Sequence, residues 1–206
     1  MRELTYAEAA LEAVAEEMRR DAKIFYMSTD AIGPLLQEFG EKRVRATPIA
    51  EAALTGMAIG AAGSGFRPIV DWRQVTFSFV AMDQIVNQAA KIHYMFGGQR
   101  AFPILYRAAV GGGTRLAAQH AQCPYSMFMN LAGLKMFLPS TPRDIKGLLN
   151  ARAPGDDRQP HYGCHVAVLT MERGYILYST DFARPPNPGR ATKCCSGFPL
   201  FAGMTI

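Results

Sequence analysis

Apolar residues in the first 150 positions of the chain recur at two different spacings. Where they repeat every three or four residues the pattern predicts helices, and where they form short continuous runs it predicts buried strands. The expected helices run from a capping box at Thr5 and Glu8 to about Asp21, and over 35–39, 52–62, 78–94 and 142–149. The expected strands cover 23–27, 44–47, 68–72, 102–107 and 134–138. This alternation predicts an α/β fold with a mostly parallel sheet and helices on both of its faces.

The pattern stops near Asn150. Residues 151–206 hold six of the thirteen prolines and three of the four cysteines, without a sustained helical or alternating spacing. Two segments, 166–171 and 175–178, could form strands, whereas the proline-rich stretch 185–189 can join neither kind of element. We therefore expect one domain over 1–150, followed by an irregular and poorly ordered tail over 151–206.

Composition narrows the class of protein. Of the 206 residues, 49% are hydrophobic, but no run reaches the roughly 18 apolar residues that a membrane-spanning helix needs. The amino terminus lacks the apolar centre of a secretory signal, so a soluble cytoplasmic protein is expected. The net charge of +5 does not predict a nucleic-acid partner, because the basic residues are scattered and only 42–45 forms a cluster.

Glu51 is the most informative single residue. It stands where the strand expected at 44–47 gives way to a helix rich in small residues, at the positive end of that helix's dipole. The carboxyl edge of a parallel sheet is also where open α/β folds bind ligands. Taken alone, Glu51 fits a favourable helix contact as well as a functional group. The choice depends on the sequence around it.

Six short motifs surround Glu51 and extend along the domain. They are Thr47-Pro48-Ile49-Ala50-Glu51, Gly63-Ser64-Gly65-Phe66-Arg67-Pro68-Ile69-Val70, Asp83-Gln84-Ile85-Val86-Asn87-Gln88-Ala89-Ala90-Lys91, Gly97-Gly98-Gln99, Gln119-His120-Ala121-Gln122 and Gly147-Leu148-Leu149. In this order and at these separations, the chain resembles the beta subunit of the thiamine-diphosphate-dependent decarboxylase of 2-oxoacid dehydrogenase complexes, of the pyruvate, acetoin and branched-chain types. The resemblance covers about residues 1–150 and implies a transketolase-like pyrimidine-binding domain. Members of that family continue into a second α/β domain, so we expect a chain that is truncated or altered after about residue 150.

The resemblance implies roles for five residues. Glu51 would hydrogen-bond a ring nitrogen of the cofactor's aminopyrimidine and favour its imino tautomer. Ile49 would pack beside that ring and Phe77 against its face, while Arg73 occupies a position where the family commonly has Met or Gln touching the cofactor. His120 would face the reacting end of the cofactor and help to pass the acyl group to a lipoyl arm. Glu51 and His120 are thus the expected catalytic residues.

In this family the cofactor lies between two subunits. A Gly-Asp-Gly motif followed by an Asn holds Mg²⁺ on the diphosphate, and this chain lacks that motif. The resemblance therefore implies a heterotetramer with an alpha subunit that holds Mg²⁺, and a lipoyl-bearing acyltransferase that receives the acyl group. We expect oxidative decarboxylation of a 2-oxoacid by the assembly, negligible activity of the chain alone, and no metal ligands within it.

The residues leave other functions open. A non-catalytic remnant would keep the fold but neither bind the cofactor nor assemble. A thiol enzyme could use His120 and Cys123, whose spacing could place both side chains on one helical face. A metal site could combine that pair with Cys164 and His165, although two adjacent residues cannot readily supply two tetrahedral ligands.

Overall fold

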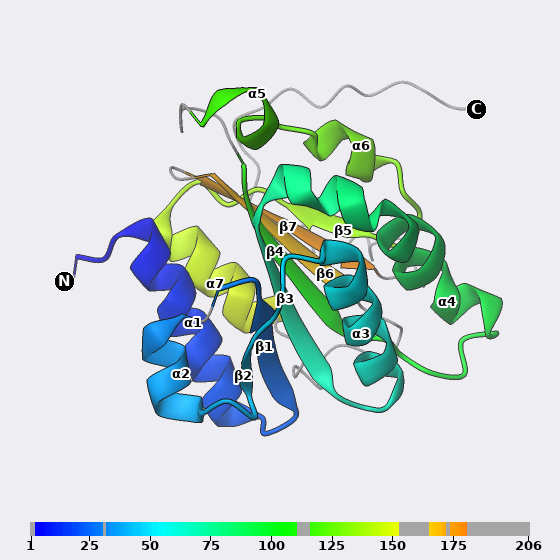
Figure 1. The fold of residues 1–206 in the computed structure, drawn as a ribbon, viewed down its shortest axis with the longest axis horizontal. Coiled ribbons are helices and arrows are strands. Elements are labelled where there is room, and N and C mark those ends of the chain that lie inside the picture. The colour runs from blue at the N-terminus through cyan, green and yellow to red at the C-terminus, as the bar shows by residue number, and fades with distance from the viewer. Residues whose placement is uncertain (1–2, 31, 111–115, 153–164, 172–173, 181–206) are drawn as a thin grey trace, which may run out of the picture.

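The computed structural model describes residues 3–30, 32–110, 116–152, 165–171 and 174–180. Within these residues, a sheet in the order β2-β1-β3-β4-β6-β5-β7 forms the centre of the molecule (Figure 1). Its strands are β1 (Ile24–Ser28), β2 (Val44–Ala46), β3 (Arg67–Gln74), β4 (Ile104–Val110), β5 (Lys135–Phe137), β6 (His165–Met171) and β7 (Gly174–Thr180). The pairings among β1 to β6 are parallel, and β7 runs antiparallel to β5 and β6. The predicted mostly parallel sheet is confirmed.

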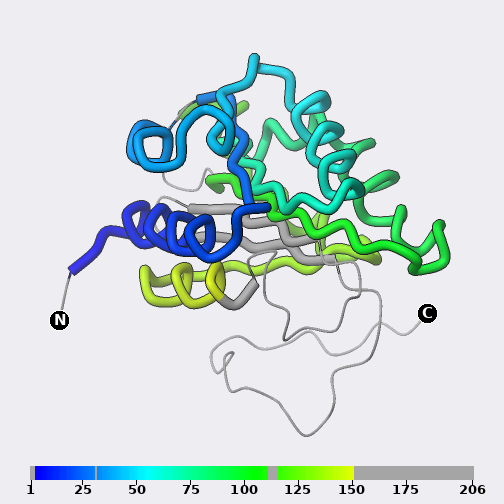
Figure 2. The backbone as a smooth tube through the Cα atoms, turned by 90° about the horizontal axis from the view of Figure 1, so that it is seen from below, coloured from blue at the N-terminus to red at the C-terminus, as the bar shows by residue number. Residues whose placement is uncertain are grey.

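Helices cover both faces of this sheet. One face carries α1 (Tyr6–Arg20), α2 (Gly33–Phe39) and α7 (Pro142–Arg152), whose apolar side chains share a core with β1, β3 and β4. Figures 1 and 2 show α1 and α7 packed side by side. The other face carries α3 (Glu51–Gly63), η1 (Val75–Ala81), η2 (Gln84–Ala89), α4 (Ala90–Met95) and α6 (Tyr125–Met129) around a second core. The short helix α5 (Ala117–His120) lies above the upper edge of the sheet in Figure 1.

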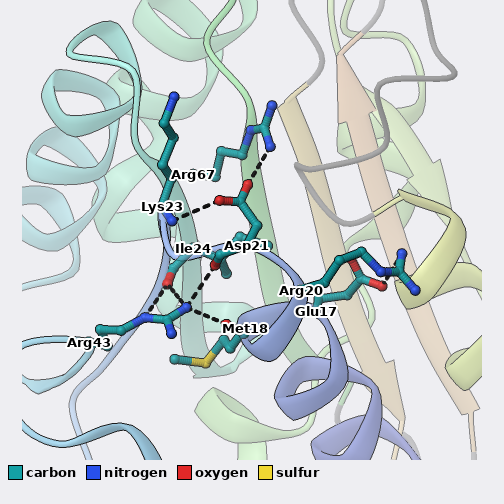
Figure 3. A network of polar contacts seen from close by, with 8 residues as sticks. All are labelled: Glu17, Met18, Arg20, Asp21, Lys23, Ile24, Arg43 and Arg67. Carbon is teal, nitrogen blue, oxygen red and sulfur yellow. Dashed lines mark hydrogen bonds and ion pairs between the residues drawn. The ribbon is translucent and has the colours of Figure 1, made fainter.

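Polar contacts fix the amino edge of the sheet, where the chain passes from α1 into β1. The predicted capping box begins α1, and the helix ends at Arg20 with Asp21 as its cap. Figure 3 shows the Arg43 guanidinium donating hydrogen bonds to the carbonyl oxygens of Met18 (2.6 Å), Asp21 (2.8 Å) and Ile24 (2.8 Å). A cation near a helix carboxyl end is favourable because it neutralises the partial negative charge there. Asp21 in turn forms an ion pair with Arg67, the first residue of β3.

The structure refines two sequence predictions. The helix expected at 78–94 consists of three successive segments, the 3-10 turns of η1, the π-helical η2 and the α-helix α4. The apolar spacing does not separate these types, because all of them bring residues three to five apart onto one side. The two possible strands of the tail are present as β6 and β7, so the sheet extends past residue 150. The remaining tail residues, 153–164 and 181–206, lie outside the described residues.

Candidate functional site

Three of the predicted site residues follow the carboxyl ends of parallel strands. Glu51 comes after β2, Phe77 after β3 and His120 after β4. Because β2, β1, β3 and β4 pair in parallel, these ends share one edge of the sheet, where ligands bind in open α/β folds. The helix α3 packs against η1, and α5 contacts η1 from above (Figure 1). The elements that carry Glu51, Phe77 and His120 therefore meet at η1.

Glu51 is the first residue of α3 and only 4% exposed. The segment that precedes Glu51 is bonded to the end of β1, because the Thr47 amide donates a hydrogen bond to the Ser28 carbonyl oxygen at 2.8 Å. In the described part of the chain, nothing donates a hydrogen bond to the Glu51 carboxylate. Buried carboxylates are normally paired or hydrogen-bonded, so this one is available to a donor from outside the domain.

Ile49 lies two residues before Glu51 and exposes 84% of its surface. A large aliphatic side chain so exposed beside a buried carboxylate presents an apolar surface to whatever binds there. The structure thus places Ile49 next to Glu51 in the chain but outside the core. Its predicted contact with a bound ring stays a prediction.

Phe77 and His120 are in direct contact. Their ring centroids are 5.0 Å apart and their planes make an angle of 88°, an edge-to-face arrangement that is favourable for aromatic rings. Phe77 is partly buried against the core beneath α3, and His120 is the last residue of α5. The contact brings together two residues that are far apart in the sequence.

Arg73 differs from the other site residues in its backbone. It adopts φ 66°, a left-handed conformation that residues other than glycine rarely take. Its amide donates to Asp71 Oδ1 at 2.8 Å, and its Nε lies 3.4 Å from Asp30 Oδ2. The side chain is half-exposed and paired with an acidic group from the end of β1. Its predicted contact with a cofactor stays a prediction.

Asp71 belongs to a buried polar network that the sequence analysis missed. Its Oδ2 accepts hydrogen bonds from the Tyr26 hydroxyl at 2.5 Å and from Arg107 at 2.7 Å. Burial, with the nearby Asp71 charge, raises the pKa of Tyr26 well above its ordinary value, so the phenol stays protonated and donates. The sequence signal was a lone carboxylate inside the apolar strand Ile69-Val70-Asp71-Trp72.

The rival chemical sites receive little support. The helix α5 ends at His120, so the predicted helical face shared with Cys123 does not form. Cys123 is an exposed free cysteine, and the His120 ring packs against Phe77 instead. Cys164 lies outside the described residues, as does the side chain of His165. In the described segments, no three His, Cys, Asp or Glu residues are grouped as metal ligands, and no helix is long and apolar enough to cross a membrane.

Comparisons with known proteins agree with the fold and identify the family of the chain. The family model for the transketolase pyrimidine binding domain matches residues 2–164. The "Pyruvate dehydrogenase E1 component subunit beta" of Rhizobium meliloti is 43% identical over 194 residues, covering 90% of this chain and 40% of the relative. The "2-oxoisovalerate dehydrogenase subunit beta" of Bacillus subtilis is 40% identical, covering 75% of this chain and 50% of the relative. The beta subunit of the acetoin:2,6-dichlorophenolindophenol oxidoreductase of Cupriavidus necator is 41% identical, with coverages of 72% and 49%.

The chain spans about half the length of these relatives, or less. Its similarity nevertheless continues past residue 150, because the family model reaches residue 164 and a coverage of 90% cannot be reached within the first 150 residues. Among solved structures, the "Split gene transketolase, inactive beta4 tetramer" superposes with a TM-score of 0.59 over 74% of this chain and 48% of that chain. At 18% identity this similarity shows the fold alone.

Proposed function

This chain belongs to the transketolase pyrimidine-binding domain family, and from that membership we propose that it is the pyrimidine-binding half of a thiamine-diphosphate-dependent 2-oxoacid dehydrogenase. The observation that carries the proposal is Glu51, a buried carboxylate on the carboxyl edge that accepts no hydrogen bond from any described residue. The names of the relatives include pyruvate, 2-oxoisovalerate and acetoin enzymes, so the proposed substrate class is a small 2-oxoacid or acetoin.

The residues present fit an aminopyrimidine ring. Such a ring has two apolar faces and a nitrogen that, when protonated, donates a hydrogen bond, and Glu51 is a buried acceptor without a donor in the described residues. Ile49 and Phe77 supply the apolar contacts, because one is exposed beside Glu51 and the other lies on the adjoining helical segment. When bound, thiamine diphosphate supplies the electron sink for decarboxylation.

The chain's own residues would hold protons and exclude water. From the first position of α3, Glu51 would hold a proton between its carboxylate and the ring nitrogen. The apolar residues of η1, Val75 and Phe77, would keep water from that hydrogen bond. His120 would exchange a proton with the substrate or the acyl acceptor, and its contact with Phe77 fixes its ring beside the same ligand.

The proposed function requires a partner subunit. The chain lacks the Gly-Asp-Gly motif that would hold Mg²⁺ on the diphosphate, so an alpha subunit would supply it and a lipoyl-bearing acyltransferase would receive the acyl group. Large apolar side chains are exposed on η1, on α4 and its C-cap, and on α6, which is typical of a protein-binding surface. They are Val80, Tyr94, Met95, Phe96 and Met129.

The test is to coexpress the chain with a matching alpha subunit and to measure thiamine diphosphate binding by calorimetry. The expected result is saturable, Mg²⁺-dependent binding by the assembly and much weaker binding by the chain alone. Activity is then compared with pyruvate, 2-oxoisovalerate and acetoin, using an artificial electron acceptor. An assembly that forms but binds no thiamine diphosphate would contradict the proposed function.

A second candidate is a non-catalytic remnant that keeps only the fold. The chain spans 40% to 56% of the pyruvate dehydrogenase relatives from Rhizobium meliloti and Rickettsia felis. The two candidates differ in the expected result of the coexpression experiment. A remnant would show neither association with an alpha subunit nor cofactor binding, whereas the proposed subunit would show both.

A further inference from the structure

We infer that Asp71 is a positioning residue for the candidate site and acts through the left-handed turn at Arg73, which leads from β3 to Phe77. The inference rests on the proposed function, because positioning affects cofactor binding only if Phe77 and His120 line that site. Asp71 is 3% exposed, and because its neighbours Val70 and Trp72 face the core of α3, its side chain lies on the opposite, α1 side of the sheet. It therefore acts through the backbone and not by touching the cofactor.

The strand β3 contains an extra residue just before the site. Asp71 pairs with Arg107 of β4, and the next pairing joins Gln74 to Ala109. These two pairings are three residues apart on β3 but only two residues apart on β4. Such a bulge changes the direction of the following side chains and is common beside functional sites. Here the extra length is taken up at Arg73, whose φ is 66°. The segment η1, which carries Phe77, begins two residues later at Val75.

One carboxylate oxygen of Asp71 stabilises this turn. Its Oδ1 accepts the Arg73 amide at 2.8 Å, which gives a hydrogen-bond partner to a backbone group that the bulge removes from the ladder. A left-handed conformation is unfavourable for a residue other than glycine. A charge-assisted hydrogen bond of this kind offsets that cost.

The other oxygen is fixed from the two neighbouring strands. Asp71 Oδ2 accepts from the hydroxyl of Tyr26 on β1 at 2.5 Å and from Arg107 on β4 at 2.7 Å. The Arg73 Nε also lies 3.4 Å from Oδ2 of Asp30, which stands two residues after the end of β1. The Asp71 carboxylate thus connects β1, β3 and β4 within the sheet. Since β3 leads to Phe77 and β4 leads to His120, the network sets the relative position of the two rings.

The test compares Asp71→Asn with Asp21→Asn. Asp21 is a matched control because it also forms an ion pair with an arginine of β3, but at the amino end of that strand (Figure 3). Both variants are measured in the full chain assembled with its alpha subunit. We expect Asp71→Asn to raise the KM for thiamine diphosphate roughly tenfold or more, with a smaller change in kcat. Asp21→Asn should leave that KM within about twofold. Equal KM values for Asp71→Asn and wild type, or equal increases in both variants, would overturn the inference.

Amide hydrogen exchange tests, without the cofactor, whether Asp71 stabilises the turn at Arg73. In the full chain, the amides of residues 73–81 should exchange faster in Asp71→Asn than in wild type, while those of α1 keep their protection. In Asp21→Asn, the amides of α1 should exchange faster than in wild type, while those of residues 73–81 keep their protection. If the wild-type assembly binds no thiamine diphosphate, the proposed function fails, and the exchange at 73–81 still decides whether Asp71 holds the turn. Unchanged exchange in that segment would show that it does not.

Discussion

The imidazole of His120 meets the ring of Phe77 edge-on, with 5.0 Å between the ring centroids. The two residues leave different strands, because η1 follows β3 and α5 follows β4. The contact therefore joins the residue proposed to lie against the pyrimidine ring to the residue proposed to act at the reacting end. A change in either ring is expected to alter the position of the other.

Phe77→Leu tests this coupling. Leucine keeps the apolar volume but removes the aromatic face and the edge contact with His120, a loss of about 0.5–1.5 kcal/mol. We expect thiamine diphosphate affinity of the assembly to fall by up to about tenfold, measured by calorimetry.

The matched control for that variant is Phe66→Leu. Phe66 also makes an edge-to-face contact, with Phe25 at 6.1 Å, but stands just before β3 at the amino edge of the sheet. The Phe66→Leu variant should leave the affinity of the assembly for thiamine diphosphate unchanged. An equal loss in both variants would mean that stability, and not the site, determines the affinity.

Glu51→Gln tests the proposed proton-holding group. The amide keeps the shape of the side chain but cannot accept the proton, so the activity of the assembly should fall by about 100-fold or more. Thermal stability of the chain should change little, because no described residue loses a hydrogen bond to Glu51. Glu41→Gln, at an exposed position before β2, serves as the control and should keep full activity. Near wild-type rates in Glu51→Gln would remove Glu51 from the mechanism.

Much of the fold could be predicted because its signals are local. The capping box at Thr5 and Glu8 begins α1, as the sequence indicated, and Gly40 ends α2 with φ 70°. The position of Glu51 at a strand-to-helix junction could also be predicted, because it depends on two adjacent elements only. These features need no knowledge of which strands are neighbours.

The Asp71 network could not be predicted, because it depends on register across three strands. Tyr26, Asp71 and Arg107 are separated by 45 and 36 residues along the chain, and only the parallel pairing of β1, β3 and β4 brings them together. The direct ring contact between Phe77 and His120 also requires the order of the strands, although the resemblance already implied that both residues belong to one cofactor site. Helix α5 was missed because four residues are too few to show a period.

The stability that the ion pairs between α7 and α1 contribute should depend on pH. Lys146 bridges Glu12 and Glu16 of α1 at 2.7 Å and 2.8 Å. Burial opposes the charged form of Glu16, but hydrogen bonds from Lys146 and Asn150 outweigh it and hold the pKa of Glu16 below its ordinary 4.5. Since the folded-state pKa is depressed, the stabilisation is present above the unfolded-state pKa and is lost as pH falls through the folded-state value. The difference in urea midpoint between wild type and Lys146→Met should therefore be larger at neutral pH than below pH ~4. A constant difference across that range would contradict this account.

Substitution by alanine should have opposite effects on the stability of the chain at Gly133 and at Gly60. Gly133 adopts φ 96° before β5, and a Cβ atom added there would lie 2.0 Å from the carbonyl oxygen of Ala90 at the start of α4. Gly133→Ala must therefore move α4 or the turn, and should destabilise the chain by roughly 2–4 kcal/mol. Gly60 lies within α3 with nothing within 4 Å of the added atom, so Gly60→Ala should stabilise the chain by about 0.5–1 kcal/mol because alanine has the better helix propensity. Urea unfolding of the two variants beside wild type checks both signs. A Gly133→Ala chain as stable as wild type would show that the turn does not pack against α4 as described.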